Sequence, residues 1–143
     1  MIPRPQQALA DLAMKLATSV APDTQSAYAA SNAGMIAMLM QCLAQDFDRA
    51  AAVRTQDIDE LVALFESLRD VPPENLAKRI ATFLRGSAES LRIEHLNARH
   101  ASAMELLIEL HAWAETVEAD ELDQEIWNFL IRHADRHAYH LPV

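Results

Sequence analysis

Three of the six histidines lie within the eight residues "HADRHAYH" near the C-terminus: His133, His137 and His140. His133 and His137 are four residues apart, so on a helix their imidazoles share one side, at a spacing that can hold a metal ion. Preceding them on the same predicted helix is an apolar stripe made of Leu122, Ile126, Phe129 and Leu130. The stripe continues through the histidines, so the pattern predicts that they face inward, with Arg132 and Arg136 on the solvent side.

A histidine from another helix is expected to approach this group. If the last two helices form a hairpin that turns near Ala119 and Asp120, residue 137 lies level with residue 102. His100 lies on the apolar stripe of its own helix, close to that level. The sequence therefore predicts a three-nitrogen site of His100, His133 and His137, completed by a ligand from another helix or by water.

Other patterns argue against metal chemistry. No Glu-x-x-His motif of the carboxylate-bridged bundles and no His-Glu-x-x-His zinc motif occurs. Imidazoles in a last helical turn are also stabilised by the negative end of the helix dipole. Two interpretations stay open, a transition-metal site and the ordinary end of a packed helix, and the second is favoured. A pH sensor ranks below both.

No catalytic residues can be assigned from the sequence. Cys42 has no basic or positively charged neighbour that would activate its thiol, so we expect it to be buried and inert. Two glycines are too few for a glycine-rich phosphate loop. The acidic group "QDIDE" reads as a helix start, with Asp57 and Glu60 as a capping box. Enzyme activity stays uncertain and is not favoured.

Composition limits the class of protein and its partners. A chain of 143 residues with 51% hydrophobic content is typical of one globular domain, residues 1–143. The net charge of −9 disfavours nucleic acids and anionic membranes, because neither offers positive charge to bind. The most apolar stretch, "AGMIAMLMQCLA", is shorter than the roughly 20 residues that span a bilayer. With no secretory signal at the start and a single cysteine, we expect a cytoplasmic protein that avoids membranes.

Helical periodicity and rare helix breakers predict an all-α fold. The sequence favours a mostly antiparallel, up-and-down bundle of five to six helices, with two long helices at about 23–52 and 87–118. A third helix is expected to begin near Asp57. The segment 33–44 is apolar nearly all round, which predicts the most buried element. Whether the chain breaks at Gly86 or near Ser102 stays open.

Three functional hypotheses follow from these patterns. The leading one is a non-catalytic bundle that acts by protein interaction or self-association, most simply as a homodimer. Its interface would use the long helices or the wide apolar arc that Trp127 and Ile131 add to the last helix. The alternative is a metal-binding bundle, or metalloenzyme, that uses the histidines. The third is a carrier of a small apolar ligand near Met35, Met38 and Met40. The biochemical role, ligand and protein partner stay open.

Overall fold

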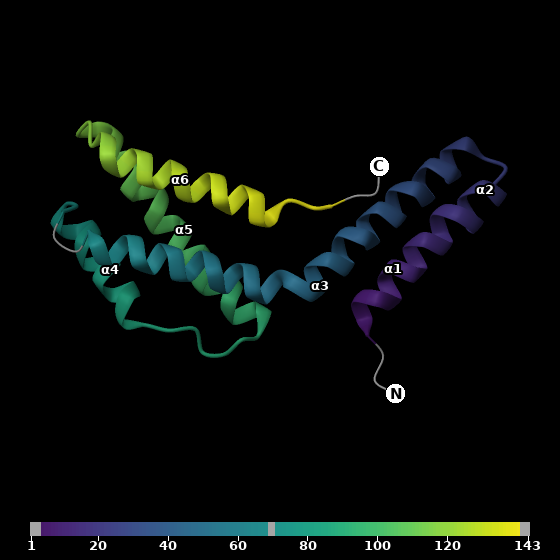
Figure 1. The fold of residues 1–143 in the computed structure, drawn as a ribbon, viewed down its shortest axis with the longest axis horizontal. Coiled ribbons are helices and arrows are strands. Elements are labelled where there is room, and N and C mark those ends of the chain that lie inside the picture. The colour runs from purple at the N-terminus through teal and green to yellow at the C-terminus, as the bar shows by residue number, and fades with distance from the viewer. Residues whose placement is uncertain (1–3, 69–70, 141–143) are drawn as a thin grey trace. The chain divides into compact units, whose positions relative to one another are not determined.

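A computed structural model describes residues 4–68 and 71–140, and every regular element in those ranges is a helix. The predicted all-α class is confirmed. In chain order the elements are α1 (Pro5–Lys15), the π-helical turn η1 (Leu16–Val20), α2 (Ala21–Asp23), α3 (Ala27–Ser67), α4 (Glu74–Arg85), α5 (Ile93–Thr116) and α6 (Asp120–His137) (Figure 1).

The chain divides into two compact units. Unit 1 comprises Met1–Ala50 and Tyr139–Val143, and unit 2 comprises Ala51–Ala138. The long helix α3 contributes its first part to unit 1 and its second part to unit 2. The expectation that residues 1–143 form one domain stays a prediction.

Helix α3 overturns the predicted break between two helices near residues 52 and 57. It is continuous over 41 residues, and Asp57 lies inside it. The sequence contains no glycine or proline between Gly34 and Pro72, so nothing stops the helix there. Asp57 and Glu60 have the spacing of a capping box, but a capping box works only where backbone amides at a helix start lack partners.

The two breaks that the sequence left open are resolved. α4 ends at Arg85, and Gly86 is extended with φ −87° and ψ 165°, so the helix breaks at this glycine. α5 begins at Ile93, later than the predicted residue 87. It continues through Ser102, whose hydroxyl donates a hydrogen bond to the backbone oxygen of Ala98 at 3.1 Å.

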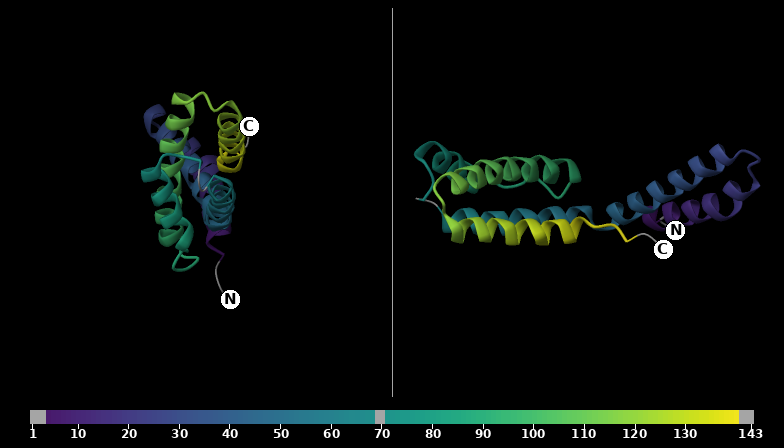
Figure 2. Two further views of the ribbon diagram at one scale, coloured as in Figure 1. Left: turned by 90° about the vertical axis from the view of Figure 1, so that its left-hand side faces the viewer. Right: turned by 90° about the horizontal axis from the view of Figure 1, so that it is seen from above.

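Unit 2 has a core of large side chains. The chain reverses between α5 and α6, and these helices pack with α4 and the second part of α3 (Figures 1 and 2). The largest fully buried apolar side chains are Leu61, Phe65, Ile80, Leu110 and Ile126. They come from all four helices, so this core fixes the relative positions of the helices that carry the histidines.

Unit 1 is held together by small side chains. α1 runs beside the first part of α3, and the side-chain amide of Gln41 donates a hydrogen bond to the backbone oxygen of Ala10 at 3.4 Å (Figures 1 and 2). The buried apolar residues described in this unit are all alanine: Ala13, Ala21, Ala33, Ala37 and Ala44.

The prediction that segment 33–44 is the most buried element is therefore wrong. Met35 and Met38 are exposed, and Cys42 is only half-buried. A helix that is apolar all round needs neighbours on every side to be buried, and within unit 1 this segment has α1 on one side.

Among the residues that the structure describes, one helix is long and apolar enough to cross a membrane. An 18-residue window of α3 has a mean hydropathy of 1.2, and 17% of it is buried. The window is longer than the 12-residue apolar stretch considered from sequence. The core helix of a soluble protein and a signal sequence near the N-terminus can both have this length and composition, and the fold is compatible with a soluble protein.

Candidate metal centre

The centre of the site is Asp57, a carboxylate with 0% exposure in the middle of α3. It occupies the position four residues before Leu61 on the stripe that also carries Phe65 and Leu68, so the helix turns it inward with these apolar residues. A buried carboxylate is rarely tolerated without hydrogen-bonding or ionic partners. The contacts of Asp57 therefore define what this region can do.

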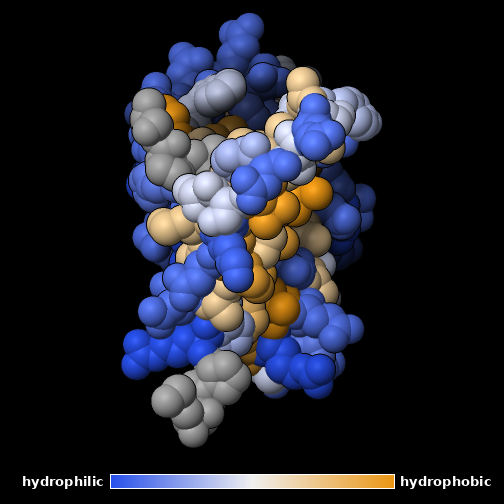
Figure 3. Space-filling model, turned by 90° about the vertical axis from the view of Figure 1, so that its right-hand side faces the viewer, coloured by the Kyte–Doolittle hydropathy of each residue, from blue (hydrophilic) through white to orange (hydrophobic). Residues whose placement is uncertain are grey.

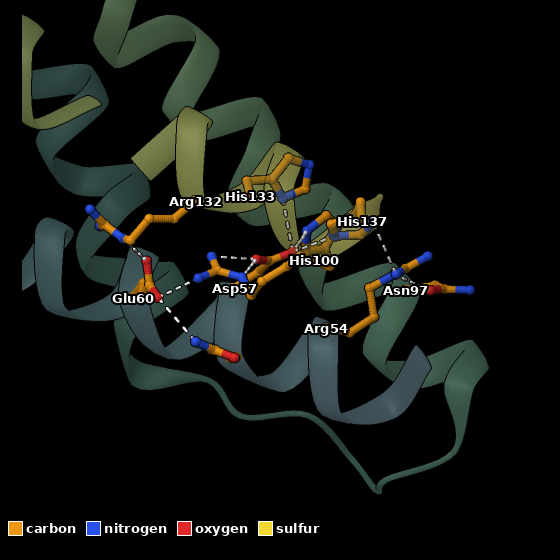
Figure 4. A network of polar contacts seen from close by, with 10 residues as sticks. Arg54, Asp57, Glu60, Asn97, His100, Arg132, His133 and His137 are labelled. Atoms are coloured by element: carbon orange, nitrogen blue, oxygen red, sulfur yellow. Dashed lines mark hydrogen bonds and ion pairs between the residues drawn. The ribbon is translucent and has the colours of Figure 1, made fainter. Parts of the chain in front are cut away.

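Three imidazole nitrogens surround one oxygen of this carboxylate (Figure 4). Oδ2 of Asp57 lies 3.1 Å from Nε2 of His100, 2.9 Å from Nδ1 of His133 and 2.8 Å from Nε2 of His137. All four potential ligand atoms lie within 4.8 Å of one another. The structure thus brings together the three histidines proposed from sequence and adds a carboxylate that the sequence reading assigned to a cap.

The histidines reach this point from two helices. His100 projects from α5, and His133 and His137 project from successive turns of α6. The rings of His133 and His137 have centroids 4.2 Å apart, and His100 stacks on His133 at 5.6 Å. Each side chain is partly shielded from solvent.

The other carboxylate oxygen is held by an arginine. Nε of Arg136 donates a hydrogen bond to Oδ1 of Asp57 at 2.8 Å, and Nη1 donates to Glu60 at 2.6 Å. Arg132 donates to the second oxygen of Glu60 at 3.0 Å. Arg136 was expected on the solvent side, but its long side chain reaches back to α3 and is mostly buried. With Oδ1 occupied, Asp57 presents Oδ2 to the histidines.

Electrostatics favour an ionised carboxylate beside a neutral imidazole. Burial raises the pKa of Asp57, but hydrogen bonds from its imidazole and guanidinium partners outweigh burial and hold the pKa well below its ordinary value of 3.8. Burial lowers the pKa of His133 below 6.5, and the neighbouring histidines add to this effect against the attraction of Asp57. Ionised carboxylate and neutral imidazole are the forms that bind metal ions.

A further contact lies at the edge of the group. Nη1 of Arg54 donates to Nδ1 of His137 at 3.5 Å, and Nε of Arg54 donates to Asn97 at 3.1 Å. The long first contact favours the form of His137 that carries its proton on Nε2 and donates it to Asp57. A metal ion on Nε2 would move that proton to Nδ1, and the Arg54 contact would have to open.

The remaining sequence candidates lie elsewhere. His140 follows the end of α6, and its backbone amide donates to Gln45. His111 pairs with Asp123 at 2.8 Å and lies 3.9 Å from Glu115, in a second cluster with a well-exposed carboxylate. Exposed acidic groups often lie near a histidine without binding metal, and we assign no site there.

The sequence reading missed Asp57, Glu60, Arg54 and Asn97. One signal could have found Asp57: an acidic residue on the apolar stripe of a stretch that contains no helix breaker. Comparisons with protein-family models, curated proteins and solved structures find no match to this chain. The chemistry of the site therefore carries the functional argument alone.

Proposed function

We propose that this chain is a metal-binding helical protein that holds one divalent transition-metal ion with Asp57, His100, His133 and His137. The observation that carries the proposal is the approach of three imidazole nitrogens to a single carboxylate oxygen. A carboxylate oxygen offers about two lone-pair directions, so three N–H donors are more than Oδ2 can accept with good geometry. A cation between the four atoms would satisfy all of them.

The distances support the same proposal. Ligands roughly 2.1 Å from an ion lie about 3.0 Å apart at right angles and about 3.4 Å apart in a tetrahedron. The three separations between Oδ2 of Asp57 and the imidazole nitrogens, 2.8–3.1 Å, are close to the first value. The nitrogens lie within 4.8 Å of one another, so they would have to move only slightly to surround an ion. Three imidazoles and one carboxylate suit zinc, and they also suit iron, cobalt or nickel.

A structural role is favoured over a catalytic one. Four protein ligands fill a tetrahedral zinc site, and closed sites of this kind stabilise folds, whereas catalytic zinc keeps a position for water. The ion would join α3, α5 and α6, which contribute all four ligands. The alternative, a metalloenzyme, needs a coordination number above four, because only then does a position remain for a substrate.

The test uses tag-free protein, stripped with chelator and titrated with zinc or cobalt. We expect one ion per chain, a rise in melting temperature, and visible cobalt bands whose intensity reports the coordination number. His133→Ala should weaken metal binding by at least about 100-fold. It removes a metal ligand, and even the loss of a residue that only hydrogen-bonds to a ligand weakens metal binding by about 10–100-fold. His111→Ala is the matched control, since it removes a partly buried histidine outside the site and should bind normally.

Two results would overturn the proposal. One is a protein that binds no stoichiometric metal and melts at the same temperature with chelator or added ion. The other is equal loss of binding in His133→Ala and His111→Ala, which would indicate scattered surface association. Strong tetrahedral cobalt bands would separately remove the metalloenzyme alternative.

Other sequence hypotheses continue as proposals. We propose a cytoplasmic location, because the single half-buried cysteine suits a reducing compartment. Self-association through α6 has one supporting observation, since Trp127 and Ile131 are both about half exposed.

The carrier hypothesis is supported by a groove of about 450 Å³ between α1 and α3, beside Met14 and Met38. A co-purifying apolar molecule found by mass spectrometry would favour it.

A further inference from the structure

The first part of α3 carries a stripe of large apolar side chains that are open to solvent. Ile36, Leu39, Leu43 and Phe47, which we call the α3 apolar face, follow one another at intervals of three or four residues and so lie on one side of the helix. Their exposed fractions are 51%, 53%, 56% and 61%. Figure 3 looks onto the end of the chain where α1, α2 and the first part of α3 lie, and hydrophobic side chains are open to view there.

Unit 1 has no element described on this face. In unit 1, α1 and the first part of α3 pack against each other along one line of contact, the α1–α3 seam, and the buried Ala33 and Ala37 lie on that side of α3. The α3 apolar face lies on a different side of α3, because a helix rotates by about 100° per residue. The large side chains thus point away from the seam while alanines fill it, the reverse of an ordinary core.

The uncovered area is that of a protein interface. Half-exposed side chains of this size each leave on the order of 100 Å² open. With Met35 and Tyr28, which flank the α3 apolar face and are also exposed, the surface reaches roughly 600 Å² per chain. Stable complexes bury about 600–1,000 Å² from each partner, so this area lies at the lower end of that range. Monomeric proteins seldom leave so large an apolar patch open without using it.

We propose that the partner is a second copy of this chain, docked through its own α3 apolar face. Two helical hairpins would then form an intermolecular four-helix bundle, in which each face buries the other. The spacing of the face matches the three-and-four repeat of packed helices, and none of its four residues is charged. An uncharged face can be self-complementary, as a two-fold interface requires. The interface does not depend on the metal.

A lipid bilayer fits this surface less well. Inserting α3 would take with it α1, whose Asp11 and Lys15 would enter hydrocarbon at high cost, or would break the hairpin. The apolar window is also followed directly by Asp46, Asp48 and Arg49. A protein surface can cover one side of the hairpin and leave these charges in water.

The test measures association of the full chain by sedimentation velocity in chelator, from nanomolar to about 100 micromolar protein. We expect a monomer–dimer equilibrium. Leu43→Lys should weaken the dimer by at least about 30-fold, since it places a charge at the centre of the interface. Ile108→Lys is the matched control, because it adds the same charge at a similarly exposed position in unit 2 and should leave the dimer intact. Circular dichroism should report unchanged helicity in both variants.

A second measurement needs no substitution. Hydrogen exchange at residues 36–47 should slow as protein concentration rises, while exchange in unit 2 stays constant. The proposal is overturned by a monomer at every concentration, by a dimer that survives Leu43→Lys, or by exchange that is independent of concentration. It is equally overturned if the monomer binds neutral phosphatidylcholine vesicles and Leu43→Lys abolishes that binding, because the face then serves a bilayer.

Discussion

The two units use the same kind of helix in opposite ways. In unit 1, alanines are buried and large apolar residues such as Leu39 and Phe47 face solvent. In unit 2, leucine, isoleucine and phenylalanine are buried, and a carboxylate is buried with them. Both arrangements occur along the single helix α3. The first part of α3 is more apolar than the second part, yet fewer elements cover it. The burial of a helix therefore depends on which elements surround it.

The buried polar group follows the same logic. Asp57 is tolerated in unit 2 because α5 and α6 supply imidazoles and a guanidinium at hydrogen-bond distance. No described helix of unit 1 surrounds α3 in that way. A buried carboxylate needs hydrogen-bond partners on several sides. Here α5 and α6 provide them for Asp57 of α3.

Removing one large side chain from each unit should destabilise the two units to very different extents. Phe65→Ala should lower the free energy of unfolding by about 3–5 kcal/mol, because it leaves a cavity in a packed core. Leu39→Ala, half exposed in unit 1, should lower it by less than about 1 kcal/mol in dilute monomer. Urea unfolding followed by circular dichroism measures both. Equal losses would show that the units do not differ in packing.

The next largest effect is expected from Asp57. In chelator, Asp57→Ala should cost about 2–4 kcal/mol of stability, because it removes an ionic partner of Arg136, whose side chain is mostly buried. Asp59→Ala is the matched control, as Asp59 is exposed on the same helix, and it should change stability by at most about 0.5 kcal/mol. If the two variants unfold at the same urea concentration, the Asp57 network contributes no stability.

Acid should weaken unit 2 in a defined direction. His133 has a lowered pKa in the folded protein, so unfolding takes up a proton, and stability is lost as the pH falls below about 6.5. Asp57 also has a lowered pKa, and its contribution is present above about 3.8 and is lost as the pH falls further. The urea midpoint of unfolding should fall from pH 8 to pH 4. In His133→Asn the midpoint should fall less steeply below pH 6.5. A midpoint that rises between pH 7 and pH 5 would contradict this.

Sequence periodicity identified the inward side of α6 and so anticipated that His133 and His137 approach His100. It also predicted the all-α class. It missed Asp57, because an acid three residues before another acid resembles a helix start when the helix is assumed to break. It misjudged Met35 and its neighbours, because a local pattern shows that a surface is apolar and does not show what covers it.

The smallest effect tests whether unit 1 is as open in solution as its packing indicates. A Cβ atom added at Gly34 would meet no heavy atom within 4 Å, so Gly34→Ala should gain about 0.5–1 kcal/mol from helix propensity alone. The reverse change at an exposed position of the same helix, Ala51→Gly, should lose about as much. Both are measured by urea unfolding in dilute protein. If Ala51→Gly behaves as expected while Gly34→Ala destabilises, the space beside Gly34 is filled in solution, and the contrast between an open unit 1 and a packed unit 2 fails at that position.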